Sequence, residues 1–207
     1  GAQVTFGKDI KATITAGRFN LENNGDMMYG IDGLGNTASY QGIEVNYAKE
    51  GSKLRAGVGY HHLGLRDWQS AMTDYHAESA NLWTVGFGYQ FTPSFAMNAA
   101  YAKNTAGEYD GKYLKDYTIE LDYKGADPAN KGSFGVWTAY RYLGSQMSVM
   151  HTTYDAVNVG QKGWEFGVNY TFAPNIMGTV IYFNGKDIDT QSDRDASKLW
   201  ARMEFFF

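Results

Sequence analysis

The sequence predicts an all-β fold, a transmembrane antiparallel up-and-down β-barrel. Long segments alternate between apolar and polar residues, so each strand has one apolar and one polar face. The connections alternate between short turns and long polar loops. Aromatic residues gather near the strand ends, where a membrane barrel carries its interfacial girdles. These three features together are typical of outer-membrane barrels.

The composition fits long β-strands and excludes other classes. The 207 residues fit a single domain over 1–207, and the 16 Tyr, 12 Phe, 5 Trp and 25 Gly, with only 3 Pro, favour extended strands. The formal charge of -4 argues against a nucleic-acid binder, and the lack of cysteine excludes thiolate metal sites. No apolar run approaches the length of a transmembrane helix.

The first elements form a short hairpin followed by a loop. Residues 3–6 are a short strand, Gly7-Lys8-Asp9 is a tight turn, and residues 10–19 have apolar residues at alternate positions. Residues 20–41 are polar and rich in glycine and asparagine, which predicts a long loop.

Two hairpins of similar length follow. Alternating residues over 43–61 flank a turn at 50–53, and a polar segment over 64–80 predicts the second long loop. The next alternating hairpin covers 82–102 and turns at Thr92-Pro93-Ser94. Each strand is about 9 to 11 residues long, which suits a tilted strand crossing a bilayer.

The third and fourth hairpins repeat this design. A loop over 105–114 leads to a hairpin over 117–142, whose turn contains Asp127-Pro128. A long loop over 143–161 leads to the fourth hairpin, over 164–186. The returning strand of that hairpin, 176–186, has consecutive apolar residues, so the sequence does not assign its faces.

The last strand follows a charged loop over 187–197. Residues 198–207, KLWARMEFFF, alternate between charged or polar and apolar positions and end on the aromatic Phe207. A closing strand of a membrane barrel has this pattern.

The strand count predicts a larger barrel. Eleven strands are expected, whereas complete bacterial barrels have an even number. The strand at 3–6 runs toward a short turn, so it is expected to start within or above the membrane. We therefore expect the C-terminal portion of a barrel of about 14 to 18 strands. The strand at 198–207 should then lack a partner on one side within these residues.

Several segments resemble a known porin family. WTVGFGYQFTPSFAMNAAYAKN, SFGVWTAYRYLG, GWEFGVNYTFAPNIMGTVIYFNGKD and KLWARMEFFF resemble the OmpM-type outer-membrane porins of diderm Firmicutes, the Negativicutes. In that family a surface-layer-homology module and a coiled-coil stalk precede the barrel. The resemblance covers most of the chain, and no pore residue of the family is carried over.

The resemblance implies an integral protein of the bacterial outer membrane. It would form a homotrimer, contact outer-membrane lipids and let small hydrophilic solutes and ions diffuse passively through a water-filled channel. The parent protein would also tether the outer membrane to peptidoglycan, through a module that these residues do not contain. No cofactor and no nucleic-acid partner are expected.

The polar faces of the strands supply candidate pore-lining residues, because a porin lines its channel with them. These are Glu44, Arg55, His61, Glu120, Asp122, Lys124, Arg141, Glu165, Arg202 and Glu204. Their charges nearly balance, so the sequence predicts no ion preference. The expected membrane-interface aromatics are Tyr47, Tyr60, Tyr89, Phe91, Phe95, Tyr101, Tyr123, Tyr142, Tyr170, Phe172 and Phe207.

Two alternatives to a porin stay open. An outer-membrane lipase, acyltransferase or protease would need a nucleophile or an acid and histidine cluster. His76 with Asp74, or His151 with Asp155, has no such motif beside it, so no enzyme is expected. A structural tether or adhesin with a closed barrel is the other alternative.

No metal site is expected. Neighbouring residues of a strand point to opposite faces, so His61 and His62 cannot bind one ion together. The acidic loops over 22–32 and 186–195 fit no defined calcium-binding spacing.

Overall fold

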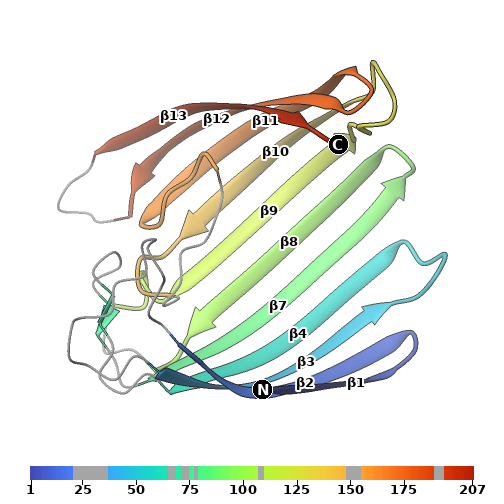
Figure 1. The fold of residues 1–207 in the computed structure, drawn as a ribbon. Helices are drawn as coiled ribbons and strands as arrows, with labels where there is room; N and C mark the ends of the chain where they lie inside the picture. The colour runs from blue at the N-terminus through green and yellow to red at the C-terminus, as the bar shows by residue number, and fades with distance from the viewer. Residues whose placement is uncertain are drawn as a thin grey trace.

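The computed structural model describes residues 1–20, 37–64, 69–70, 75–76, 79–106, 110–147, 155–188 and 194–207. In this part of the chain, eleven antiparallel strands form one sheet whose order follows the sequence. Figure 1 shows them tilted side by side in a curved sheet, with short turns at one end and long connections at the other. The predicted all-β, up-and-down architecture is therefore confirmed.

The strands match the predicted series. Their bounds are β1 (Ala2–Gly7), β2 (Ile10–Asn20), β3 (Thr37–Ala48), β4 (Leu54–Gly64), β7 (Ser79–Thr92), β8 (Phe95–Asn104), β9 (Lys115–Lys124), β10 (Phe134–Leu143), β11 (Gln161–Ala173), β12 (Ile176–Asp187) and β13 (Asp195–Phe205). Two short strands, β5 (Gln69–Ser70) and β6 (Tyr75–His76), pair with each other in a segment expected to be a loop.

Several strands extend further toward the long connections than the sequence predicts. β3 begins at Thr37 and β7 at Ser79, both inside segments expected to be loops. The added residues are polar or small, and they continue the ladder because backbone pairing does not require apolar side chains. Hydropathy alternation therefore marks only the middle and the short-turn end of these strands.

The short turns are compact. Gly7 between β1 and β2 has φ of 102°, and a Cβ there would lie 2.0 Å from the carbonyl oxygen of Ile10. Asn175 closes the turn between β11 and β12 at φ of 64°, a conformation that asparagine tolerates. These turns fix the register of each hairpin.

The structure assigns the faces of β12. Val180 and Tyr182 are exposed on one face, whereas Ile181 and Phe183 are buried on the other. Ile181 and Phe183 pack with Leu143, Ala156 and Val157, so the described residues 155–157 of the β10–β11 connection cover them. β12 therefore has two apolar faces, of which one is exposed and the other is buried under residues 155–157.

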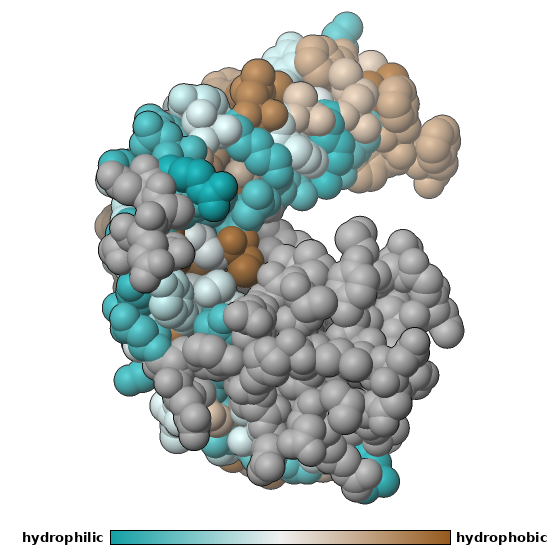
Figure 2. Space-filling model, turned by 90° about the vertical axis from the view of Figure 1, so that its left-hand side faces the viewer, coloured by the Kyte–Doolittle hydropathy of each residue, from teal (hydrophilic) through white to brown (hydrophobic). Residues whose placement is uncertain are grey.

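The sheet is open within the described residues. β1 pairs only with β2, and β13 pairs only with β12. Figure 2, viewed from the long-connection end, shows the described strands as an arc rather than a closed ring. The outer edge of β13 is unpaired, as expected for residues 198–207. No helix in the described part of the chain is long and apolar enough to cross a membrane.

Candidate functional site

Strand register divides the side chains of the sheet into two faces. Directly paired residues share a face, so Ile43, Tyr60 and Trp83 lie together. Their exposed apolar face is the convex one. The other face is enclosed by the curvature, and its Arg141 and Glu165 are only 4% and 2% exposed. The concave face therefore carries the buried charges.

The convex face is apolar over all eleven strands. It exposes large hydrophobic side chains from β1 at one edge to β13 at the other, such as Val4, Ile119 and Leu199. Leu199 is 71% exposed. An apolar surface of this extent on a monomeric soluble protein is unusual and marks a surface that contacts lipid or protein.

Aromatic side chains form two rows on the convex face. In the row near the short turns, Phe91 stacks on Phe95 at 5.3 Å between ring centroids. In the row near the long connections, Tyr60 meets Trp83 at 4.8 Å. Phe91 and Trp83 lie eight residues apart on β7, which is about 26 Å along the strand at ~3.3 Å per residue.

The predicted aromatics divide between these rows. The short-turn row contains Tyr47, Tyr89, Phe91, Phe95, Tyr123, Tyr170 and Phe172, with Phe207 beyond the end of β13. The long-connection row contains Tyr60, Tyr101 and Tyr142.

Sequence reasoning missed several members of the two rows. Among them are Trp83, Tyr117, Phe134, Tyr140 and Trp164. Each of them lies on the same face as predicted aromatics of its hairpin, and this alternation could have identified it from the sequence.

Arg141 is the centre of a charged cluster on the concave face of β9, β10 and β11. Its Nη2 donates to Glu120 Oε2 at 2.6 Å and to Glu165 Oε1 at 2.7 Å. Its Nη1 donates to Thr118 Oγ1 at 2.9 Å. Trp137 Nε1 donates to the same Glu165 oxygen at 2.9 Å. The structure thus brings together three residues that the sequence placed only on a common face.

The same wall carries an excess of carboxylates. Asp122 accepts a hydrogen bond from Asn98 Nδ2 at 2.7 Å, and Asp116 accepts one from the backbone N–H of Gly144 at 2.6 Å. With Glu120 and Glu165 these make four carboxylates on the concave faces of β9 and β11, opposite Arg141 on β10, so the described residues of this wall include more carboxylates than arginines.

A second polar group lies on β3 and β4. The Tyr40 hydroxyl and His61 Nδ1 are 2.7 Å apart, and His61 Nε2 lies 3.9 Å from Glu44 Oε1. Arg55 projects from the start of β4, near the short turns, and is exposed. His61 and Glu44 therefore contact each other, whereas Arg55 stands apart.

A third group joins β13 to the β10–β11 connection. Lys198 Nζ donates to the backbone oxygen of Asp155 at 2.8 Å, and Arg202 Nη1 lies 3.7 Å from Asp155 Oδ2. Arg202 also pairs with Glu204 at 3.2 Å and lies 5.0 Å from the Trp200 ring centroid. These contacts hold residues 155–157 on the concave face of β12 and β13.

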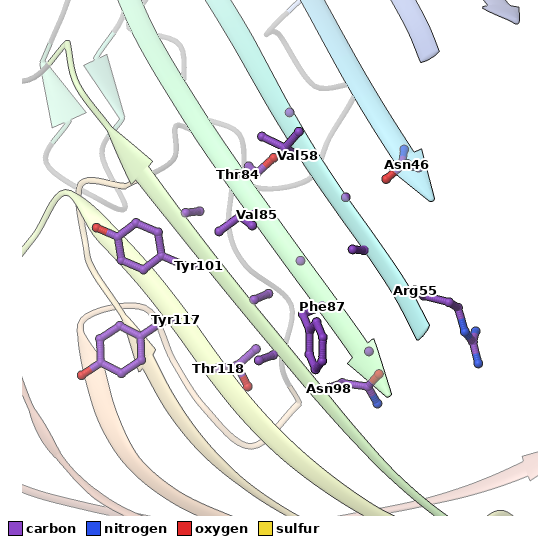
Figure 3. A pocket seen from close by; sticks show the side chains of 18 of the residues that line it. Asn46, Arg55, Val58, Thr84, Val85, Phe87, Asn98, Tyr101, Tyr117 and Thr118 are labelled. Atoms are coloured by element: carbon purple, nitrogen blue, oxygen red, sulfur yellow. The ribbon is translucent and has the colours of Figure 1, made fainter. Parts of the chain in front are cut away.

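A hollow of about 680 Å³ lies on the concave side, across β3 to β9. Small residues make room for it, among them Gly57, Gly86 and Ala100. Figure 3 shows the polar side chains of Asn46, Arg55, Thr84, Asn98 and Thr118 around it. Of its charged or polar lining, the sequence places Glu44, Arg55 and Asp116 on polar faces, and Asn46, Thr84, Asn98 and Thr118 share the alternation phase of those faces.

Lys124 is placed at the end of its strand. Its φ is 57°, and its Nζ lies 5.4 Å from the Tyr123 ring and 4.6 Å from the Phe134 ring. Both rings belong to the short-turn row of the convex face. Lys124 therefore lies at the rim of the sheet, over these aromatics.

The described residues do not assemble a metal-binding cluster. They contain no cluster of three or more histidine or acidic side chains able to hold a metal ion. Asp155 contacts Lys198 and Arg202.

The remaining residues of the alternative catalytic and metal sites are outside the described residues, or are described only by their backbone. Asp74, His151 and the acidic segment 22–32 fall outside, as do residues 189–193 of the acidic loop 186–195. His76 lies in the short strand β6.

Comparison of the chain with models of known protein families and with curated protein sequences gives no match. Function is therefore inferred from the two faces of the sheet.

Proposed function

We propose that this chain forms part of the wall of an outer-membrane porin, through which small hydrophilic solutes and ions diffuse passively. One observation carries the proposal. The same strands present an apolar convex face between two aromatic rows and a polar, hollowed concave face. A membrane barrel with a water-filled lumen needs this division, because its outer side meets lipid and its inner side meets water.

The open sheet supports a barrel larger than the described strands. Among the described strands, none pairs with the outer side of β1 or β13, and unpaired backbone groups are costly in the hydrocarbon region. We propose that further strands of the same protein pair with both edges and close a barrel of about 14 to 18 strands. The proposed porin is of the OmpM type and trimeric, and its parent protein tethers the outer membrane to peptidoglycan.

Planar-bilayer recording of the full-length protein tests the porin proposal. Gly86 lies on the concave face, and a Cβ added there meets no atom within 4 Å. Gly86→Trp should therefore fit the fold, project an indole into the lumen and lower the single-channel conductance.

Val85 provides a matched control on the same strand. It is 50% exposed on the convex face, so Val85→Trp should leave the conductance unchanged. The absence of any channel in the unmodified protein would exclude a porin. Equal effects of the two substitutions would exclude the assignment of the concave face to the lumen.

A further inference from the structure

Four lysines lie on the convex face beyond the long-connection aromatic row, in two directly opposed pairs. Lys103 on β8 pairs with Lys115 on β9, and Lys162 on β11 pairs with Lys186 on β12. Tyr142 on β10 lies between the two pairs, as the register partner of both Tyr117 and Lys162. The four ammonium groups therefore share one face and one end of the sheet.

Direct opposition of like charges is unfavourable in a sheet, because the two ammonium groups repel each other. Within the described residues, neither Lys103 nor Lys115 forms an ion pair with a carboxylate, and Lys115 Nζ lies 5.5 Å from the Tyr142 ring. Asp195 is the partner of Lys186 on β13, so the second pair has one acidic neighbour. The charge repulsion within the Lys103–Lys115 pair is therefore less compensated than that within the Lys162–Lys186 pair, so an external anion would stabilise the first pair more.

The height of the lysines matches that of lipid phosphates. Lys103, Lys115 and Lys162 lie two residues beyond Tyr101, Tyr117 and Trp164 on the same strands, which is about 5 Å further along the barrel axis. Aromatic rows of membrane barrels lie at the headgroup level, and lysines just beyond them reach the charged groups of the lipid.

The opposite end of the sheet differs. Among the described register pairs, none near the short turns opposes two lysines. There, Lys124 lies over the Tyr123 and Phe134 rings, and Lys53 donates to the backbone oxygen of Phe91. Among the described residues, directly opposed lysines are therefore confined to the long-connection end of the convex face.

We propose that Lys103 and Lys115, extended by Lys162 and Lys186, bind the phosphate groups of anionic lipids in the leaflet at the long-connection end. The proposal rests on the proposed membrane location of the convex face. The phosphate lies between the two opposed ammonium groups and relieves their repulsion, and the acyl chains lie along the apolar strands below. Such a lipid would be retained around the barrel as a bound annulus.

Native mass spectrometry of the full-length protein in detergent tests this site, with dipalmitoyl phosphatidic acid and dipalmitoyl phosphatidylcholine as probes. The unmodified protein should prefer the phosphatidic acid. The variant K103Q/K115Q should bind it about thirtyfold more weakly, because each of the two lysines contributes about 1 kcal/mol to anionic-lipid attraction. Inorganic phosphate as competitor separates lipid recognition from capture of a free anion, since efficient displacement by phosphate alone would overturn a lipid site.

A second double variant controls for general loss of charge. K49Q/K131Q removes two lysines from the short turns, and it should keep the lipid preference. Equal lipid binding by K103Q/K115Q and the unmodified protein would overturn the proposal, as would an equal loss in the control.

Two readouts keep the test independent of folding and of the porin proposal. Lipid binding by the unmodified protein should weaken as salt is raised, and salt-insensitive binding would contradict a charged site. Bilayer conductance of the same samples reports on the pore alone. A conducting protein without lipid preference overturns only this site, whereas lipid preference without conductance overturns only the porin.

Discussion

Arg141 shows how strongly one residue can depend on its partners. Glu165 is 2% exposed, and Arg141 is the cation that neutralises it. A buried carboxylate that loses its cation keeps the cost of leaving water without the compensating attraction. The intact cluster therefore contributes little to the free energy of unfolding, whereas a single substitution that breaks it lowers that free energy strongly.

Arg141→Leu is expected to lower the free energy of unfolding by about 3–5 kcal/mol, because it leaves Glu165 buried and unpaired. Urea unfolding of the full-length protein in lipid vesicles measures this change. Arg55→Leu is the control, since Arg55 is exposed on the same face, and it should cost less than about 0.5 kcal/mol. Similar losses for the two variants would contradict the role given to the cluster.

Gly167 is the second residue on which the cluster depends. The Trp137 ring lies over it, and a Cβ at residue 167 would come within 2.0 Å of the ring. Gly167→Ala should displace the indole from Glu165 and destabilise the protein by roughly 1–3 kcal/mol. A red shift and altered intensity of tryptophan fluorescence would report the displacement. Gly86→Ala, where the added Cβ meets open space, should leave both measurements unchanged.

At the scale of the element, strands β9 to β11 give the concave face a local charge. Their concave residues include Asp116, Glu120, Asp122 and Glu165, opposed by Arg141. Within the proposed lumen this wall attracts cations and repels anions. The near balance of charge in the whole candidate set does not extend to each wall separately.

The double variant E120Q/D122N is expected to lower the cation-to-anion permeability ratio by about twofold, because two carboxylates leave the wall. Reversal potentials in a salt gradient measure this ratio. E50Q/D195N removes two carboxylates from a short turn and from the convex face, and it should leave the ratio unchanged. An unchanged ratio in E120Q/D122N would place this wall outside the ion path.

The elements also show what sequence periodicity can and cannot predict. Alternation located the middle of every main strand and the common face of Glu120, Arg141 and Glu165, because side-chain direction has a period of two. It did not predict which charges meet, since pairing depends on the register between strands. It also left β12 unassigned, because Ile181 and Phe183 are covered by a connection whose path no local pattern encodes.

At the scale of the whole molecule, the open sheet has two exposed edges. Amides on the outer edges of β1 and β13 should exchange with solvent deuterium much faster than those of β8, which is paired on both sides. Hydrogen exchange on residues 1–207 in detergent tests this expectation, and in the full-length protein both edges should become protected. Equal rates at all three strands of the shorter chain would indicate that it closes on itself.

Residues 155–157 pack on the concave face of β12 and β13, which would line the passage of the proposed porin. Their contacts with Phe183, Lys198 and Arg202 thicken one side of the wall, whereas the glycines and alanines of β4, β7 and β8 leave another side hollow. In the proposed porin, a route past these strands would run along the hollowed side. A solute that follows it would travel close to Arg55, Asn98 and Thr118, so transport selectivity would be decided by a minority of the circumference.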